Sequence, residues 1–197
     1  MKQIHIRASL KVGWGLFMKR PWYLLGLLIA LVLLFMATSS QGAIVTALAY
    51  VVNAGYLALL LRHFAGETLV FDDIFSVDQQ KWISFAFLAL IKGVAIVLGL
   101  VCFIIPGVYL AVRWMFAELY VIDKGMRPLE ALKASSKLTE GVRWKLFLFS
   151  LVAVFLMLIG FVFFIVGAFV VSIICSFAVI KIYKDLQSEV QEEAMVV

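Results

Sequence analysis

The chain has 197 residues, of which 65% are hydrophobic and 15% are charged, and it carries a formal net charge of +5. A soluble core of this size cannot bury so much apolar surface, so the composition excludes a water-soluble globular protein. We expect one all-α membrane domain over residues 1–197, with membrane lipids as partners and without nucleic-acid binding.

Residues 1–20 predict an amphipathic helix that rests in the plane of the lipid headgroups. One helical face holds Ile6, Leu10, Gly13, Trp14 and Phe17. Lys11 and Lys19 lie on the opposite face, as expected for a helix at a membrane interface. No cleavage pattern typical of a signal peptide follows, so we expect this segment in the mature protein.

Residues 22–62 predict the first helical hairpin. The uncharged run from Pro21 to Leu61 is about twice the ~20 residues that cross the hydrocarbon as one helix. Polar and small residues at 38–42 mark the turn. Asn53, near the middle of the second span, is expected to hydrogen-bond a neighbouring helix.

Residues 82–123 allow two topologies. The uncharged run from Gly93 to Val112 has the length of one crossing, but it contains Pro106-Gly107. This pair is a strong turn signal, because proline lacks a backbone donor and glycine tolerates positive φ. A single crossing would give the chain five spans, whereas a hairpin that turns at Pro106-Gly107 would give six.

Charge bias separates these topologies, because short loops rich in Lys and Arg stay cytoplasmic. The relevant bases are Lys2, Arg7, Lys11, Lys19 and Arg20 before the first hairpin, and Lys124, Arg127, Lys133, Lys137, Arg143 and Lys145 after the second. Only the hairpin keeps both groups on one side. We predict six transmembrane helices in three hairpins in the cytoplasmic (inner) membrane, with both termini cytoplasmic.

Residues 127–140 predict a second interfacial helix, with Pro128 in its first turn and Gly141 at its end. Its expected wet face consists of Glu130, Lys133, Lys137 and Glu140, with Ala131, Leu132, Ser135 and Leu138 behind. This helix is expected to lie on the cytoplasmic side.

Residues 142–184 predict the third hairpin, which turns between Gly160 and Gly167. Ser172 and Ser176 belong to a stripe of small residues that suits close helix packing. Residues 186–197 are expected to form an acidic tail.

A tryptophan follows a basic residue where each hairpin begins, at Trp22, Trp82 and Trp144. The spacings of 60 and 62 residues are consistent with three copies of one unit: interfacial helix, anchor and hairpin. The other interpretation is that any protein built of hairpins carries bases and tryptophans at its inner surface.

Three ionisable residues fall within predicted spans: Lys92, Glu118 and Arg113. Lys92 and Glu118 are equally far from Ile105 in sequence, so a hairpin turning there places them at the same depth. The favoured interpretation is a neutralising structural pair; the other is part of a transport path. Arg113 is expected to reach the outer headgroups, where it would contact an anion such as a lipid phosphate.

Catalytic and metal-binding patterns are missing from the sequence, so we expect neither enzymatic activity nor a cofactor. Cys102 and Cys175 lie far apart in apolar runs and are interpreted as packing residues. His5 and His63 are interpreted as isolated surface residues.

A further pattern combines Ile105-Pro106-Gly107-Val108-Tyr109-Leu110 with Arg113-Trp114, Asp123-x-Gly125-x2-Pro128 and Gly141-x2-Trp144. It resembles poorly characterised prokaryotic six-helix membrane proteins related to the membrane domain of some glycerophosphodiester phosphodiesterases. The resemblance implies a multi-pass membrane protein associated with envelope or lipid metabolism. It implies no phosphodiesterase activity, because the catalytic domain is missing from this sequence.

We therefore expect a non-enzymatic membrane protein that binds lipids or other membrane proteins in envelope assembly or homeostasis. The alternative is a small transporter or channel that uses Lys92, Glu118 and Arg113.

Overall fold

The computed structural model describes residues 6–38, 43–67, 78–102, 104–163 and 165–195. These residues form helices and connecting turns without strands, which confirms the predicted all-α class. The helices are α1 (Ile6–Lys19), α2 (Pro21–Thr38), α3 (Ala43–Phe64), α4 (Gln79–Cys102), α5 (Ile104–Arg113), α6 (Ala117–Lys124), α7 (Pro128–Leu138), α8 (Arg143–Phe163) and α9 (Ile165–Met195).

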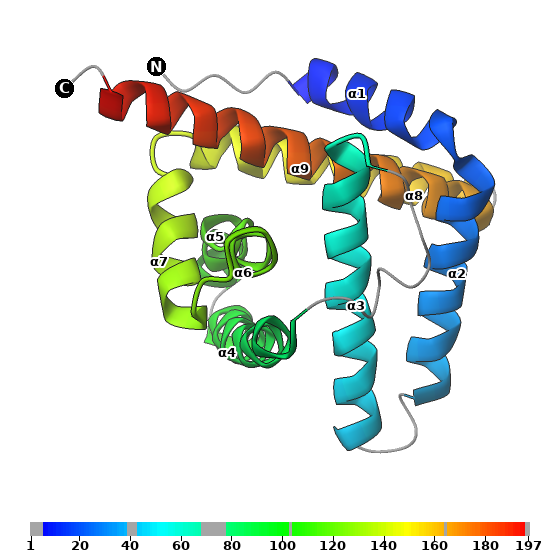
Figure 1. The fold of residues 1–197 in the computed structure, drawn as a ribbon, viewed down its shortest axis with the longest axis horizontal. Helices are drawn as coiled ribbons and strands as arrows, with labels where there is room; N and C mark the ends of the chain where they lie inside the picture. The colour runs from blue at the N-terminus through cyan, green and yellow to red at the C-terminus, as the bar shows by residue number, and fades with distance from the viewer. Residues whose placement is uncertain (1–5, 39–42, 68–77, 103, 164, 196–197) are drawn as a thin grey trace.

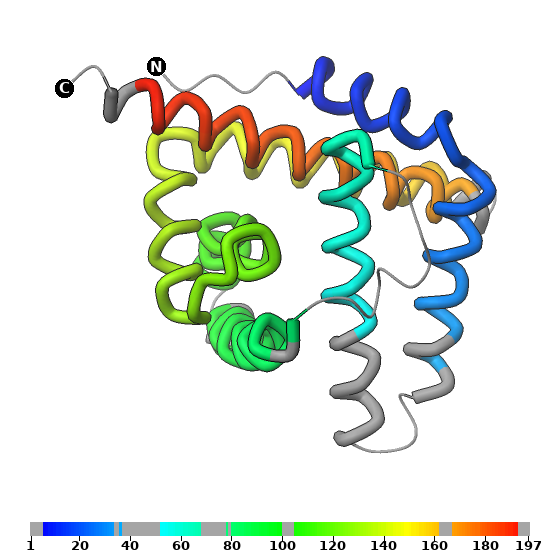
Figure 2. Tube along the Cα trace, viewed as in Figure 1, coloured from blue at the N-terminus to red at the C-terminus, as the bar shows by residue number. Residues whose placement is uncertain are grey.

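Three helical hairpins make up most of the fold. The first pairs α2 with α3, the second pairs α4 with α5 and α6, and the third pairs α8 with α9. The hairpins run in three different directions: α2 and α3 descend through the view, α4 to α6 are seen nearly end-on, and α8 and α9 cross it (Figure 1). The same directions are clear in the tube trace (Figure 2).

The core lies where the hairpins meet, at the ends of the helices that carry the charged residues. Its fully buried members come from all three hairpins and include Leu24, Leu60, Leu88, Phe116, Phe149, Phe177 and Tyr183. Ring contacts join the second hairpin to the third, with Tyr120 edge-on to Tyr183 at 5.1 Å between ring centroids. Each hairpin therefore has one well-packed end.

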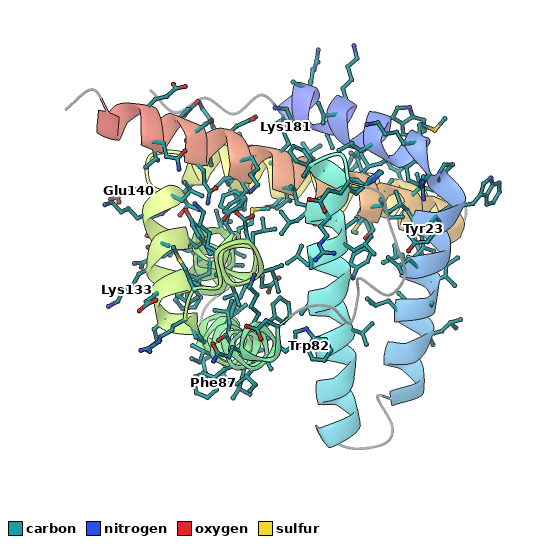
Figure 3. The ribbon with its side chains drawn as sticks, in the orientation of Figure 1. Tyr23, Trp82, Phe87, Lys133, Glu140 and Lys181 are labelled. Atoms are coloured by element: carbon teal, nitrogen blue, oxygen red, sulfur yellow. The ribbon has the colours of Figure 1, made fainter. Side chains whose placement is uncertain are left out.

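Away from this core the helices present continuous apolar surface. On α4 the exposed residues are Ile83, Phe87, Leu90, Val94, Val97 and Leu98; on α8 they include Leu148, Leu151, Val152, Val154, Phe155, Leu158 and Phe161. Figure 3 shows Phe87 directed away from the bundle, on the outer side of α4. A soluble monomer rarely exposes apolar patches of this extent, so these faces require a lipid or protein covering.

Among the described residues, four helical stretches are long and apolar enough to cross a bilayer: Gln80–Gly99, Ile105–Lys124, Arg143–Phe161 and Gly167–Glu192. A fifth is obtained if α1 and α2, which are bent by 96° relative to each other, are counted as one broken span. The fold thus contains four to five candidate spans within the described part of the chain.

Helix α4 ends at Cys102 and α5 begins at Ile104, so the second hairpin does not turn at the predicted Pro106-Gly107. Pro106 and Gly107 lie instead in the first turns of α5, where proline is tolerated because the first helical N–H groups have no partner within the helix. Gly99 allows close packing against Gly107: a Cβ placed on Gly99 would lie 2.9 Å from the Gly107 Cα. The second residue of the predicted turn therefore lies in a contact between helices.

In the third hairpin α8 ends at Phe163 and α9 begins at Ile165, both between Gly160 and Gly167, where the turn was predicted. The two glycines lie in the helices, and a Cβ on Gly160 would come within 2.9 Å of the Gly167 carbonyl carbon, so the helices approach closely there. The residues predicted as a separate acidic tail continue α9 as far as Met195.

Helix α1 does not present its whole predicted apolar face to a membrane. It packs along α9, burying Ser9, Gly13, Leu16 and Phe17, while the Trp14 side chain is exposed. His63 fixes the end of α1, because its buried Nε2 donates to the Leu16 carbonyl over 3.2 Å. The interpretation of His63 as a surface residue was therefore wrong.

Helix α7 confirms its predicted faces. Glu130, Lys133, Lys137 and Glu140 are exposed, whereas Ala131, Leu132, Ser135 and Leu138 are buried. Figure 3 shows Lys133 and Glu140 directed away from the bundle. The order of one helix followed by a hairpin thus occurs twice, in α1–α2–α3 and in α7–α8–α9.

Gly13→Ala is expected to destabilise the protein, because the added Cβ would lie 2.5 Å from the Ile174 carbonyl oxygen and would force α1 away from α9. Gly15→Ala is the matched control, since nothing lies within 4 Å of its added Cβ. The control should gain up to about 1 kcal/mol from helix propensity. Thermal unfolding in detergent measures both; equal melting temperatures for the two variants would contradict the packing.

Candidate functional site

Lys92 and Glu118 form an ion pair between the two arms of the second hairpin. Lys92 Nζ on α4 lies 2.9 Å from Glu118 Oε1 on α6, and the two side chains are 16% and 35% exposed. The contact anticipated from their spacing is therefore present. It neutralises the lysine in the middle of an otherwise apolar helix, where an isolated charge would be costly.

The register of this pair follows from the close contact of Gly99 with Gly107. Lys92 lies as far before Gly99 as Trp114 lies after Gly107. The antiparallel arms therefore place Trp114 opposite Lys92. Glu118 is about one helical turn further on, a distance that two long side chains can bridge. The equal spacing of Lys92 and Glu118 from Ile105 predicted the right partners, although α5 already begins at Ile104.

The surroundings of Lys92 are largely apolar. A cavity of about 390 Å³ next to it is lined by Val108, Ala111, Val112, Met115, Phe147, Ser150, Leu151 and Val154. Apart from Lys92, Ser150 is the only residue of this lining with a polar side chain, and its hydroxyl donates to the Leu146 carbonyl within α8. A transport path needs polar or hydrated groups, so this lining favours the structural interpretation of the pair.

Arg113 bonds α7, because its Nε donates to the Ser136 hydroxyl. The chain unwinds directly after it, at Trp114–Phe116 between α5 and α6. The expected contact of Arg113 with an anion at the outer headgroups stays a prediction.

Hydroxyl groups of α7 stabilise that break. The Ser135 hydroxyl donates to the Arg113 carbonyl over 3.0 Å and accepts from the Phe116 N–H over 3.2 Å. The Thr139 hydroxyl oxygen lies 3.3 Å from the same carbonyl. Backbone groups freed by a broken helix must find partners away from water, and these side chains supply them. The sequence analysis missed this role, because Ser135 was recognised only by its helical face.

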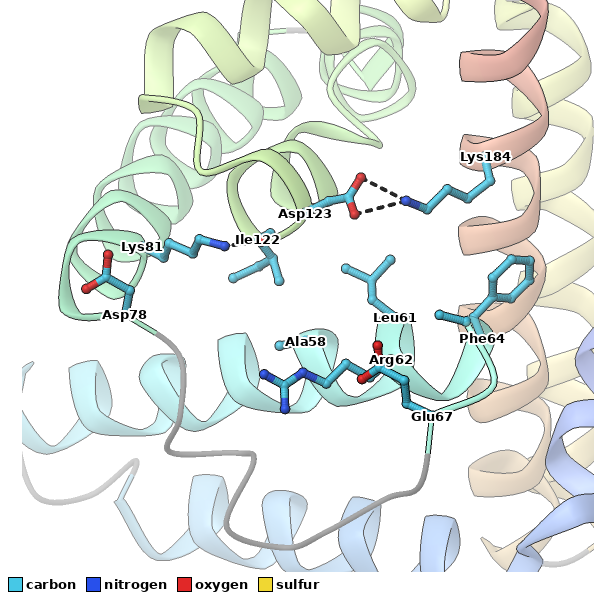
Figure 4. Close-up of a pocket in the computed structure, with 11 residues that line it drawn as sticks. Ala58, Leu61, Arg62, Phe64, Glu67, Asp78, Lys81, Ile122, Asp123 and Lys184 are labelled. Atoms are coloured by element: carbon cyan, nitrogen blue, oxygen red, sulfur yellow. Dashed lines mark hydrogen bonds and ion pairs between the residues drawn. The ribbon is translucent and has the colours of Figure 1, made fainter.

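A polar pocket of about 360 Å³ lies at the junction of the three hairpins. Its charged lining consists of Arg62, Glu67, Asp78, Lys81, Asp123 and Lys184, contributed by the end of α3 and by α4, α6 and α9 (Figure 4). Three bases face three acids, so the formal charges of the lining balance. Lys81 Nζ donates to the Ile122 carbonyl over 3.0 Å, which ties the start of α4 to the end of α6.

Asp123 binds two side chains of α9 at this pocket. Its two carboxylate oxygens each lie 2.9 Å from Lys184 Nζ, and Oδ2 accepts from the Tyr183 hydroxyl over 3.2 Å. Figure 4 shows Lys184 reaching from α9 to Asp123. Because Asp123 belongs to the second hairpin and its partners belong to the third, these bonds hold the two hairpins together.

The remaining predicted residues are less involved in packing than expected. Asn53 is exposed and so does not bury an amide between helices. Ser176 donates to the Ser172 carbonyl of its own helix over 2.9 Å. The exposure of Asn53 does not support its predicted contact with a neighbouring helix, and the packing role of Ser172 and Ser176 stays a prediction.

The predicted anchors differ in exposure. Trp22 and Trp144 are 85% and 70% exposed, whereas Trp82 is half-buried and its indole nitrogen has no hydrogen-bond partner within the described residues. Cys175 is buried and free, and the side chains of Cys102 and His5 lie outside the described residues. In the described part of the chain, no group of acidic, histidine and cysteine side chains is arranged to hold a metal ion.

No family model, curated protein or solved structure matches the chain. The resemblance to the membrane domain of glycerophosphodiester phosphodiesterases therefore stays a prediction.

Lys92→Ala is expected to lower the free energy of unfolding by about 1–3 kcal/mol, because Glu118 would lose its partner in a largely apolar site. Lys92→Met combined with Glu118→Leu should recover most of that loss. Unfolding in detergent measures both, with the exposed Lys133→Ala as control. A double variant no more stable than Lys92→Ala would show that the two charges do not stabilise each other.

Asp123→Asn is expected to cost about 1–3 kcal/mol, because the charge-assisted bonds to Lys184 are lost. The control is Asp185→Asn, which removes an exposed pair with Lys181 one helical turn away and should cost no more than about 0.5 kcal/mol. Unfolding by denaturant in detergent compares them. Similar losses of unfolding free energy in both variants would contradict the role of Asp123 in holding the two hairpins together.

Proposed function

We propose that the chain is a non-enzymatic multi-pass protein of the cytoplasmic membrane that binds lipids or partner proteins in envelope assembly or homeostasis. The observation that carries this proposal is the exposed apolar surface along α4 and α8, outside a core where the charged residues pair. Such surface requires a covering, and the hydrocarbon of a bilayer supplies one.

The bases favour a cytoplasmic position for α1 and α7. Both helices contact α9, and the exposed face of α7 carries Lys133 and Lys137. Basic residues at a membrane surface are attracted to the anionic cytoplasmic leaflet by about 1 kcal/mol each. This placement keeps both termini on the cytoplasmic side, in agreement with the charge pattern of the sequence.

The number of membrane crossings depends on whether the second hairpin spans the bilayer. Six crossings satisfy the charge bias, but so does a second hairpin that stays at the inner leaflet, since its ends remain on one side in either case. Spanning helices tilt by up to about 40° from the bilayer normal, so the directions in Figure 1 cannot all be those of upright spans.

One contact favours the second hairpin lying at the inner leaflet. Arg143 Nη1 donates to the Tyr109 hydroxyl over 2.6 Å. Tyr109 lies near the reversal of the second hairpin, whereas Arg143 begins the third. In two upright antiparallel hairpins these residues would lie near opposite surfaces, so six upright crossings would require this contact to break.

Cysteine labelling of whole cells tests the topology, in a chain whose Cys102 and Cys175 are replaced by alanine. Ile105→Cys, at a position 82% exposed, reports on the tip of the second hairpin, and Phe161→Cys reports on the tip of the third. Ser135 is buried, so Lys137→Cys reports on α7. We expect only Phe161→Cys to react with an impermeant reagent added outside.

Labelling of Ile105→Cys from outside would establish the six-crossing topology, and labelling of Lys137→Cys from outside would refute the cytoplasmic assignment. Solute flux through purified protein in liposomes, if abolished by Lys92→Ala, would favour the transporter over the binding protein. Recovery of the chain in the soluble fraction without detergent would overturn the whole proposal.

A further inference from the structure

An apolar groove lies between α5 and α8. A cavity of about 540 Å³ is lined there by Val108, Tyr109, Val112, Arg143, Trp144 and Phe147. The 390 Å³ cavity next to Lys92 shares Val108, Val112 and Phe147 with it and continues along α8 to Leu151 and Val154. Both volumes fall in the range of ligand sites, which are mostly apolar with a few well-placed polar groups.

Arg143 supplies the charge at one end of this groove. Its guanidinium donates to two neutral oxygens, the Tyr109 hydroxyl over 2.6 Å and the Ser136 carbonyl over 3.2 Å. Its buried Nε has no hydrogen-bond partner among the described residues, and Nη1 and Nη2 each carry a second N–H. The cation also lies 5.3 Å from the centre of the Tyr109 ring, which fixes its position. A positive group with unused donor capacity at the end of an apolar groove is complementary to an anionic amphiphile.

The aromatic residues at the same end suit a membrane interface. Trp144 is largely exposed and stacks on Phe147 at 5.3 Å between ring centroids. Tryptophan and arginine are favoured at the level of the lipid headgroups. From Arg143 to Val154, α8 rises by about 16 Å, close to the depth of one leaflet. The groove therefore runs from the headgroup level into the hydrocarbon.

We propose that this groove binds one phospholipid with an anionic headgroup. The Arg143 guanidinium binds the phosphate, and one acyl chain lies against Val108, Val112 and Phe147. A zwitterionic lipid fits the same apolar surface but brings a second cation towards Arg143, so the site selects for net negative charge. This inference rests on the membrane placement proposed above and deepens it by naming the lipid class.

Native mass spectrometry of the detergent-purified chain tests the site, with phosphatidylglycerol and phosphatidylcholine of identical acyl chains added in turn. The wild-type chain should bind phosphatidylglycerol at least about tenfold more tightly, as expected for a hydrogen bond between charged groups. Arg143→Gln should abolish this preference. Arg127→Gln removes the same charge from an exposed position outside the groove and should retain the preference.

Two further variants keep the proposal falsifiable if Arg143→Gln fails to fold. Val108→Trp should fill the groove and weaken phosphatidylglycerol binding while Arg143 stays in place. Tyr109→Phe frees one guanidinium donor and should preserve or tighten binding. Equal binding of both lipids by the wild-type chain, or equal losses in Arg143→Gln and Arg127→Gln, would overturn the proposal. A chain that stays in the membrane fraction yet shows no lipid preference refutes only this inference, whereas a chain found in the soluble fraction refutes the proposed function.

Discussion

The ion pair of Asp123 with Lys184 holds the second hairpin against the third at the ends where both carry their charges. Around it, Lys81 bonds the end of α6 and Tyr183 bonds Asp123, so one small region joins α4, α6 and α9. The apolar arms beyond this region need few contacts with one another, because a bilayer can cover them.

Away from that junction, two interior polar groups of the second hairpin have local partners. Lys92 is neutralised by Glu118, and the open backbone between α5 and α6 is bonded by the hydroxyl of Ser135. Both arrangements satisfy groups that hydrocarbon cannot solvate. Both belong to the second hairpin, which also contacts the start of α8 through Tyr109.

That contact gives Arg143 a role that its neighbouring bases do not share. Lys133 and Lys137 point to solvent from α7, whereas Arg143 lies between the Tyr109 hydroxyl and the Ser136 carbonyl. The same guanidinium closes one end of the apolar groove. The way the two hairpins cross, rather than the number of bases in the loop, singles out this residue.

The sequence by itself determined the helical class, the limits of most helices and the two faces of α7, because these depend on local periodicity and on Pro and Gly signals. It also predicted that Lys92 and Glu118 are partners, since two residues equally far from the turn of a hairpin lie at the same depth. Tertiary structure decided the break after Arg113, the burial of His63, the exposure of Asn53 and the directions of the hairpins. These depend on which side chain meets which neighbour, and a residue such as Ser135 is separated from the backbone it bonds by about twenty positions of sequence. Local patterns carry no information about such partners, so Arg143 could be recognised as a base but not as the charged end of a groove.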